Sequence, residues 1–167
     1  KVGAGRGHAL RMISYAQNFE DAMLWRSLKD VERGCYVDLG AQDPVIDSVS
    51  LWFYEQGWRG VNVEATPAYA QALRQARPDE LVIQAAVGER RGLVPFFDIP
   101  DTGISTGDES VASEHRARGF ETRRIDVPCL PLSDVLDRVQ AVEVHWLKID
   151  VEGMESEVLR SWTPSKV

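Results

Sequence analysis

Two short turns of the sequence combine small and acidic residues in a way that suits a nucleotide-like ligand. The apolar run over residues 36–39 ends at Gly40 and Ala41, and a second apolar run ends at Glu64. Glycine lets the backbone approach a ligand that a larger side chain would keep away. An acid roughly 20 residues beyond such a turn is placed to accept hydrogen bonds from ribose hydroxyls. The spacing predicts an adenosine-containing cofactor here; a tight turn and a surface glutamate are the alternatives.

The charges around the first turn discriminate between cofactors. The turn lacks the G-x-G-x-x-G fingerprint of dinucleotide-binding units, and Asp38 and Asp43 flank it. Carboxylates repel a diphosphate, which binds bare backbone amides at a helix N-terminus. They suit a cofactor with a cationic end, such as the sulfonium and amino groups of S-adenosylmethionine. The electrostatics therefore favour a methyl donor over NAD.

A third acidic turn, LKIDVEG over residues 147–153, follows another apolar segment. Asp150 lies where a predicted strand gives way to a helix, and we expect it to face the same crevice as the first two turns. There it would hold the amino group of the cofactor or act as a base toward a substrate hydroxyl. Glu152 is expected to cap the last helix through its N-terminal amides.

Apolar periodicity predicts the elements that position these turns. Buried strands are expected at residues 36–39, 61–63, 81–87 and 144–151, alternating with helices at 47–56, from Thr66-Pro67 onward, at 133–139 and at 153–162. Such alternation is typical of a parallel sheet with right-handed crossovers. The predicted fold class is therefore α/β, with a mainly parallel sheet and helices on both faces. Ligands of such sheets bind beyond the carboxyl ends of the strands.

The region over residues 93–130 interrupts this alternation. Two further strands, 93–99 and 124–130, enclose a polar stretch rich in Gly, Ser and Thr. We interpret this region as an inserted substrate-binding lid that folds over the cofactor. Residues 1–12 contain no apolar segment and are expected to be a flexible lead-in, which leaves the domain at 13–167.

The last predicted strand, residues 144–151, is expected to have an open side. A doubly wound sheet places more strands beyond this point, whereas the sequence ends after the next helix. We therefore expect a domain without its C-terminal strands. The exposed edge would be covered by a further segment or by another chain in an oligomer.

Composition excludes several functional classes. The 167 residues carry 19 Lys and Arg against 26 Asp and Glu, a net charge of −7, which argues against nucleic acid as a partner. The locally basic stretch over 116–124 is expected to be a solvated face, with contact to an anionic substrate as the alternative. No apolar run approaches the roughly 20 residues that span a membrane.

Cys35 and Cys129 are the only cysteines of the sequence. Two cysteines are too few for a disulfide framework or a cysteine-based metal site. We expect both to be reduced core thiols in a cytoplasmic protein. No tight spacing of acidic residues or histidines predicts a metal site either.

Five segments of the sequence occur in the order of the motifs of one family: SYAQNFED, YVDLGAQDP, DSVSLWFYEQGWRGVNVEATP, DTGIST and LKIDVEGMESEVL. In these segments, within residues 13–162, the sequence resembles the FkbM family of S-adenosylmethionine-dependent methyltransferases. The resemblance implies a Rossmann-like class I methyltransferase fold and methyl transfer from S-adenosylmethionine to a hydroxyl oxygen. Acceptors in such families are typically sugars of glycans or secondary metabolites.

Carried over by position, the resemblance also assigns contacts to the cofactor. The implied contacts are Gly40, Ala41 and Gln42 with the methionine part, Ser48 near its carboxylate, Glu64 with the ribose, Ala65 beside it, Ala86 and Val87 at the adenine, and Asp150 at the amino group or methyl. Tyr15, Gln17 and Asp21 would help to close the site. Gln42 stands where relatives commonly have His or Asn, and Ala65 where they have Pro; we expect both to permit cofactor binding.

Methyl transfer to a hydroxyl usually needs a base that takes the proton. Asp150 and His115 are the candidate bases, and an ordinary loop or helix histidine is the alternative for His115. Asp101, Thr102 and Ser105 are candidate contacts to a sugar. The alternative for these three is simple turn chemistry, in which Asp, Thr and Ser are common.

The sequence as a whole therefore predicts an S-adenosylmethionine-dependent O-methyltransferase that acts on a hydroxyl of a sugar, glycan or secondary metabolite. Two alternatives remain. One is a non-catalytic or incomplete cofactor-binding domain within a larger assembly. The other, a nucleotide-binding oxidoreductase, is disfavoured by the missing glycine fingerprint and by the acids around Gly40.

Overall fold

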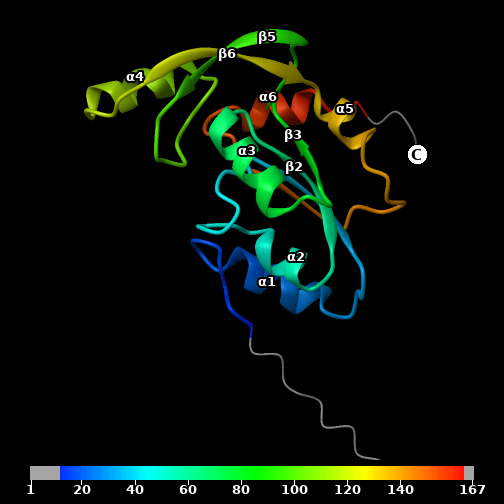
Figure 1. Cartoon of the computed structure of the whole chain (residues 1–167). Helices are drawn as coiled ribbons and strands as arrows, with labels where there is room; N and C mark the ends of the chain where they lie inside the picture. The colour runs from blue at the N-terminus through cyan, green and yellow to red at the C-terminus, as the bar shows by residue number, and fades with distance from the viewer. Residues whose placement is uncertain (1–11, 164–167) are drawn as a thin grey trace, which may run out of the picture.

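Four parallel strands form the sheet that carries the predicted turns, and two of them, β2 (Arg59–Val63) and β3 (Leu81–Ile83), are labelled in Figure 1. The computed structural model describes residues 12–163, so the predicted lead-in lies outside the described residues except for Met12. The strand order is β3, β2, β1 (Cys35–Leu39) and β7 (Trp146–Ile149). The chain runs outward from β1 to β3 and returns with β7 on the other side of β1. This order places a topological switch point between β1 and β7, where ligands of open α/β sheets bind.

The register of the sheet aligns the ends of three strands. Leu39 lies opposite Val63 of β2 and opposite Ile149 of β7. The residues that follow, Gly40, Glu64 and Asp150, therefore begin their turns at the same level of the same edge. The three predicted turns are brought together as the parallel arrangement requires.

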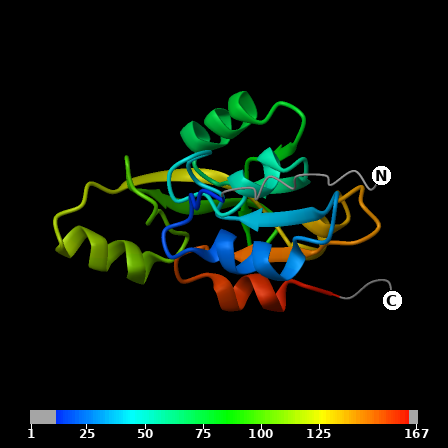
Figure 2. The ribbon, with the colours of Figure 1, turned by 90° about the horizontal axis from the view of Figure 1, so that it is seen from below.

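Helices cover both faces of this sheet, with α3 (Pro67–Ala76) and α6 (Glu155–Arg160) on opposite sides of β1 (Figure 2). One face packs on α5 (Leu132–Leu136) and α6 through a cluster of aliphatic side chains from β1, β2 and β3. The other face packs on α1 (Glu20–Leu28) and α2 (Leu51–Glu55), largely through aromatic rings. This second cluster includes Tyr36 and Trp146, whose rings stack at 4.7 Å between centroids. The helices on both faces bury the sheet as expected for parallel strands.

The single strand predicted for residues 81–87 is wrong, because the chain bends in its middle. Residues Leu81–Ile83 pair with β2, whereas Ala86 and Val87 form a separate strand, β4 (Ala86–Val87), in a second sheet. Glu64 N donates to Ile83 O and Ala85 N donates to Glu64 O, at 3.0 and 3.1 Å. These bonds keep the bend beside Glu64, so β4 leaves the first sheet at the edge where the predicted turns meet.

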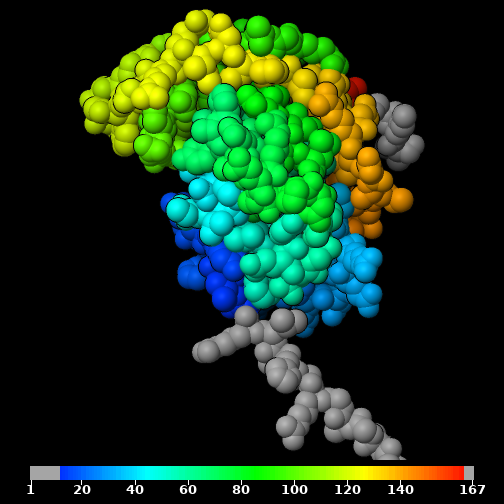
Figure 3. Space-filling view, in the orientation of Figure 1, coloured from blue at the N-terminus to red at the C-terminus, as the bar shows by residue number. Residues whose placement is uncertain are grey.

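The region over residues 93–130 forms an arm that extends away from the body (Figure 3). It contains β5 (Gly92–Asp98), α4 (Glu109–Ala117) and β6 (Arg123–Leu130). The second sheet has the order β4-β6-β5, with β5 and β6 antiparallel. Asp108 is the N-cap residue of α4, and its carboxylate accepts hydrogen bonds from Ser110 N and Val111 N. The basic stretch over 116–124 lies on this arm, where Arg116, Arg123 and Arg124 form exposed ion pairs.

Strand β7 lies at the end of the first sheet, so in the part of the chain that the structure describes one of its sides has no strand partner. The two cysteines are buried and free, as expected from the sequence.

Replacement of Gly40 by alanine should lower the free energy of unfolding by about 3 kcal/mol or more, because two costs combine there. Gly40 has φ 74°, and a Cβ at this position would overlap the backbone carbonyl of Asp150. Gly57 is the matched control, since its φ is 88° but a Cβ would meet nothing within 4 Å. Gly57→Ala should therefore cost only about 1 kcal/mol. Urea denaturation of both variants checks this, and equal losses would contradict the predicted overlap.

Candidate functional site

A cavity of about 770 Å³ opens at the carboxyl ends of β1, β2 and β7. Residues that directly follow these strands form the floor of the cavity. Residues of α1 and of the loop before it form a wall, and residues 102–105 of the arm form part of the rim. The volume lies within the range of roughly 300–1,000 Å³ that is usual for small-molecule sites. The position agrees with the edge predicted from the switch in strand order.

Most of the residues predicted from the sequence line this cavity. They are Gly40, Ala41, Gln42, Glu64, Ala65, Ala86, Val87, Thr102, Ser105 and Asp150, together with Gln17. The structure thus collects residues from six separate segments around one space.

Other predicted residues lie elsewhere. Asp38 and Ser48 are buried beneath the cavity, at 1% and 2% exposure, and do not line it. Asp101 is exposed on the arm and lies outside the lining. Tyr15 and Asp21 also lie outside it; the Asp21 carboxylate accepts hydrogen bonds from Tyr15 N and Ala16 N and so anchors the loop before α1.

Glu64 is the most deeply set acid of the cavity. Its Oε2 accepts a hydrogen bond from Gln42 N at 2.9 Å, and its Oε1 accepts one from Thr66 N at 2.7 Å. The carboxylate therefore fixes the turn after β1 against the start of α3. Burial raises its pKa, although these backbone donors oppose the shift. Each carboxylate oxygen can accept a second hydrogen bond, so the group can still bind a hydroxyl.

Lys148 connects the floor of the cavity to its acids, a role that the sequence analysis missed. Its Nζ donates to Gly40 O at 2.8 Å and forms ion pairs with Asp38 at 3.2 Å and Asp150 at 3.4 Å. Burial disfavours the charge on Lys148, but Asp38 and Asp150 outweigh it and raise its pKa. The signal in the sequence that could have indicated this role was a lysine inside an otherwise apolar strand.

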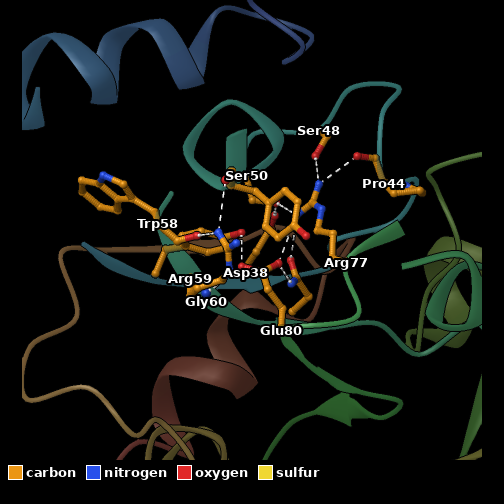
Figure 4. A network of polar contacts seen from close by, with 12 residues as sticks. Asp38, Pro44, Ser48, Ser50, Trp58, Arg59, Gly60, Arg77 and Glu80 are labelled. Carbon is orange, nitrogen blue, oxygen red and sulfur yellow. Dashed lines mark hydrogen bonds and ion pairs between the residues drawn. The ribbon is translucent and has the colours of Figure 1, made fainter. Parts of the chain in front are cut away.

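A buried arginine, Arg77, holds the loop between β1 and α2 from below, and Figure 4 shows its guanidinium joined to Ser48 and Pro44. It donates to Pro44 O and Ser48 Oγ, both at 2.8 Å, and to Ser50 Oγ at 2.7 Å. Ser50 Oγ in turn donates to Asp38 at 2.7 Å. The arginine thus ties the loop next to the cavity into the core.

Glu80 is the buried counter-ion of this arginine. Its carboxylate lies 3.7 Å from the Arg77 guanidinium and accepts hydrogen bonds from Tyr36 Oη, Gly60 N and Asn62 Nδ2 at 2.6, 2.7 and 2.9 Å. Burial raises the pKa of Glu80, and these partners oppose the shift. Nothing in the local sequence around either residue indicated the pair.

His115 lies in α4 and is 8% exposed, with its ring against Phe120. It does not line the cavity, and neither ring nitrogen has a hydrogen-bond partner within residues 12–163. Its proposed role as a base therefore has no direct geometric support here. The ring packs as a core side chain of the arm.

The predicted sugar contacts of the arm are partly used within their own turn. Thr102 Oγ1 donates to Ile99 O at 2.7 Å, and Ser105 Oγ accepts from Ile99 N at 2.9 Å. Both side chains still line the cavity. The turn lies directly over the cavity floor, since a Cβ on Gly103 would fall 2.7 Å from Gln42 Oε1.

Glu152 lies next to this turn, because Thr106 Oγ1 donates to Glu152 O at 2.6 Å. Its side chain lines the cavity and is half-buried, so it does not act as the predicted cap of the last helix. Instead, Glu155 accepts hydrogen bonds from Val151 N and Gly153 N at 3.3 and 3.2 Å. Burial raises the pKa of Glu152, and the nearby carboxylates of Asp150 and Glu155 add to this rise.

Two further features are absent from residues 12–163. No group of three or more His, Cys, Asp and Glu side chains is arranged to hold a metal ion. None of the described helices has the length and apolar character needed to cross a membrane.

Comparison with known proteins assigns the chain to a family by its sequence. A family model described as the methyltransferase FkbM domain matches residues 38–167. Comparison with curated proteins and with solved structures gives no match. The matched range includes every strand of both sheets except the first three residues of β1.

Proposed function

The chain belongs to the methyltransferase FkbM family, and from this premise we propose that it transfers a methyl group from S-adenosylmethionine to a hydroxyl oxygen of a sugar or another small molecule. The fold is proposed to be of the Rossmann-like class I type, because the first sheet has the order expected around the switch point. The arrangement of Gly40, Glu64 and Asp150 around one cavity is the observation that carries the proposal.

The residues that line the cavity support this choice of cofactor. The apolar residues Ala86 and Val87 would flank the adenine, and Glu64 would accept the ribose hydroxyls. Gly40 and Gln42 would lie along the methionine part, where acids around the floor favour its cationic groups. A diphosphate would meet the same acids unfavourably, which argues against NAD.

Asp150 is our proposed base. Its side chain is 60% exposed and lines the cavity, so a substrate hydroxyl can reach it. When bound, S-adenosylmethionine supplies an electrophilic methyl carbon, whose bond to sulfur breaks as the bond to the hydroxyl oxygen forms. Asp150 would take the hydroxyl proton during this transfer, and Lys148 would hold its carboxylate in place at 3.4 Å.

Calorimetric titration tests the proposal, with S-adenosylmethionine, S-adenosylhomocysteine and NAD as ligands. We expect the two adenosyl compounds to bind with a Kd on the order of 1–100 μM, and NAD not to bind. Glu64→Ala should weaken their binding roughly 100-fold, because charge-assisted hydrogen bonds to the ribose are lost. Glu32→Ala is the control, since it removes the same charge from an exposed position outside the cavity.

Two results would count against the proposal. Binding of NAD without binding of S-adenosylhomocysteine would favour an oxidoreductase. Wild-type affinity in Glu64→Ala would show that the cofactor does not occupy the cavity floor. Circular dichroism of each variant separates loss of binding from loss of folding.

A further inference from the structure

The charged side chains that line the cavity are nearly all acidic. The lining acids are Glu20, Asp47, Glu64, Asp150 and Glu152, and Lys148 is the one cation among the described residues of the lining. One bound cofactor molecule with one net positive charge cannot neutralise the negative charge of these acids. The charge of the cavity therefore carries information about the second molecule that it binds.

Lys148 does not offset the acids farther from the floor. Its ammonium group is already shared between Asp38, Asp150 and the carbonyl oxygen of Gly40. All three donors of a lysine are thus directed at groups of the protein. An anionic ligand would find no uncommitted cation in the part of the lining that the structure describes.

Two of the acids, Glu20 and Glu152, come from the start of α1 and from the turn after β7, not from the turn after β2 that carries Glu64. Glu152 is next to the turn of the arm, through the hydrogen bond from Thr106. Glu20 lies at the start of α1. Burial acts to raise the pKa of Glu20, but hydrogen bonds to its carboxylate and the nearby charge of Lys148 outweigh burial, so the pKa is lowered. Lys148 also opposes the rise in the pKa of Glu152, so both acids lie near the ion pair of Lys148 and Asp150, where the hydroxyl of an acceptor would meet the proposed base.

Glu152 is the acid with the clearest need for a cation. It is half-buried, and within residues 12–163 its carboxylate has neither an ion-pair partner nor a hydrogen-bond donor. Burial, Asp150 and Glu155 raise the pKa of Glu152 and so disfavour its charge, and they outweigh the opposing effect of the nearby His115 and Lys148. Glu20, in contrast, accepts from Asn18 N and Nδ2 at 2.9 and 3.1 Å and keeps lone pairs for a further donor.

We infer that the acceptor is an amine-bearing polyol, of the amino sugar or aminocyclitol class, whose ammonium group is bound by Glu152 with Glu20 nearby. This inference rests on the proposed function, and the cavity itself, rather than the acids alone, defines the site. An ammonium group satisfies a half-buried carboxylate through a charge-assisted hydrogen bond. Phosphorylated or carboxylated acceptors meet like charges and are excluded.

Ligand-detected NMR with matched probes tests this inference, in the presence of saturating S-adenosylhomocysteine. The probes are D-glucosamine, N-acetyl-D-glucosamine and D-glucose 6-phosphate, which differ in charge on a common ring. We expect D-glucosamine to bind about tenfold more tightly than the neutral probe, and the phosphate not to bind. Glu152→Gln should abolish this preference, whereas Glu32→Gln should leave it unchanged.

Every outcome decides the inference. It is overturned if the neutral or phosphorylated probe binds as well as D-glucosamine, or if the preference survives in Glu152→Gln. It is also overturned if S-adenosylhomocysteine binds but no amine-bearing probe does, and in that case the proposed function stands. If S-adenosylhomocysteine itself does not bind, the result contradicts the proposed function and, with it, the inference that rests on it.

Discussion

The Asp150→Asn variant is expected to transfer methyl groups about 10²–10⁴-fold more slowly than the wild-type chain, which is the usual contribution of a general base. Asparagine has nearly the same shape but cannot take the hydroxyl proton. Binding of S-adenosylhomocysteine should change little, because Gly40 and Glu64 would provide other contacts to the cofactor under the proposed function. Turnover is measured with radiolabelled S-adenosylmethionine and a pool of hydroxyl acceptors, and affinity by calorimetry.

His115→Leu is the comparison that separates the two candidate bases. Since the ring lies outside the cavity and has no partner for either nitrogen, we expect turnover within about twofold of wild type. Two outcomes contradict this assignment. A loss of turnover in His115→Leu with intact cofactor binding would identify His115 as the base. Equal losses of affinity and turnover in Asp150→Asn would mean that Asp150 binds the cofactor's amino group instead.

Arg77→Met should lower the free energy of unfolding by about 3–5 kcal/mol, the usual cost of removing one partner of a buried ion pair. The variant leaves Glu80 as a buried carboxylate without its cation. It also removes the hydrogen bonds that hold Pro44, Ser48 and Ser50, so the loop beside the cavity should loosen. Urea denaturation measures the loss, and protection of the loop amides from hydrogen exchange measures the loosening.

The double variant Arg77→Met/Glu80→Gln is the control for the charge. It should recover part of the stability, because the unpaired carboxylate is then absent. Arg74→Met, which changes an exposed arginine in the last turn of α3, three residues before Arg77, should cost little. If Arg77→Met and Arg74→Met are equally stable, Arg77 does not anchor the loop.

The stability deficit of Arg77→Met should also depend on pH. Burial raises the folded-state pKa of Glu80 above its ordinary value, so its charge costs stability as the pH rises through that pKa. Without Arg77 the pKa should rise further. The deficit is therefore largest near neutral pH and narrows as the pH falls toward the ordinary pKa of a glutamate, because more of the Glu80 carboxyl is then protonated. A deficit that does not change with pH would mean that lost packing, not charge, dominates.

The meeting of three turns at the floor of the cavity could be predicted from the sequence. Short apolar runs that alternate with helical segments specify parallel strands, and the carboxyl ends of parallel strands meet at one edge. Gly40, Glu64 and Asp150 each directly follow such a run, and the observed register places all three side by side. Periodicity and strand polarity are local properties, which is why this part of the site needed no tertiary information.

The electrostatic partners within the site were decided only by the tertiary structure. Asp38 and Lys148 form their ion pair across neighbouring strands, and Arg77 reaches Pro44 and Ser48 from the far end of another helix. His115 carried a chemically suitable side chain, but the packing of α4 turned it toward Phe120. The bend between Ile83 and Ala86 likewise depended on which strand each half could pair with. Such contacts join residues far apart in the chain, so no local pattern encodes them; they are set by how the helices and strands pack.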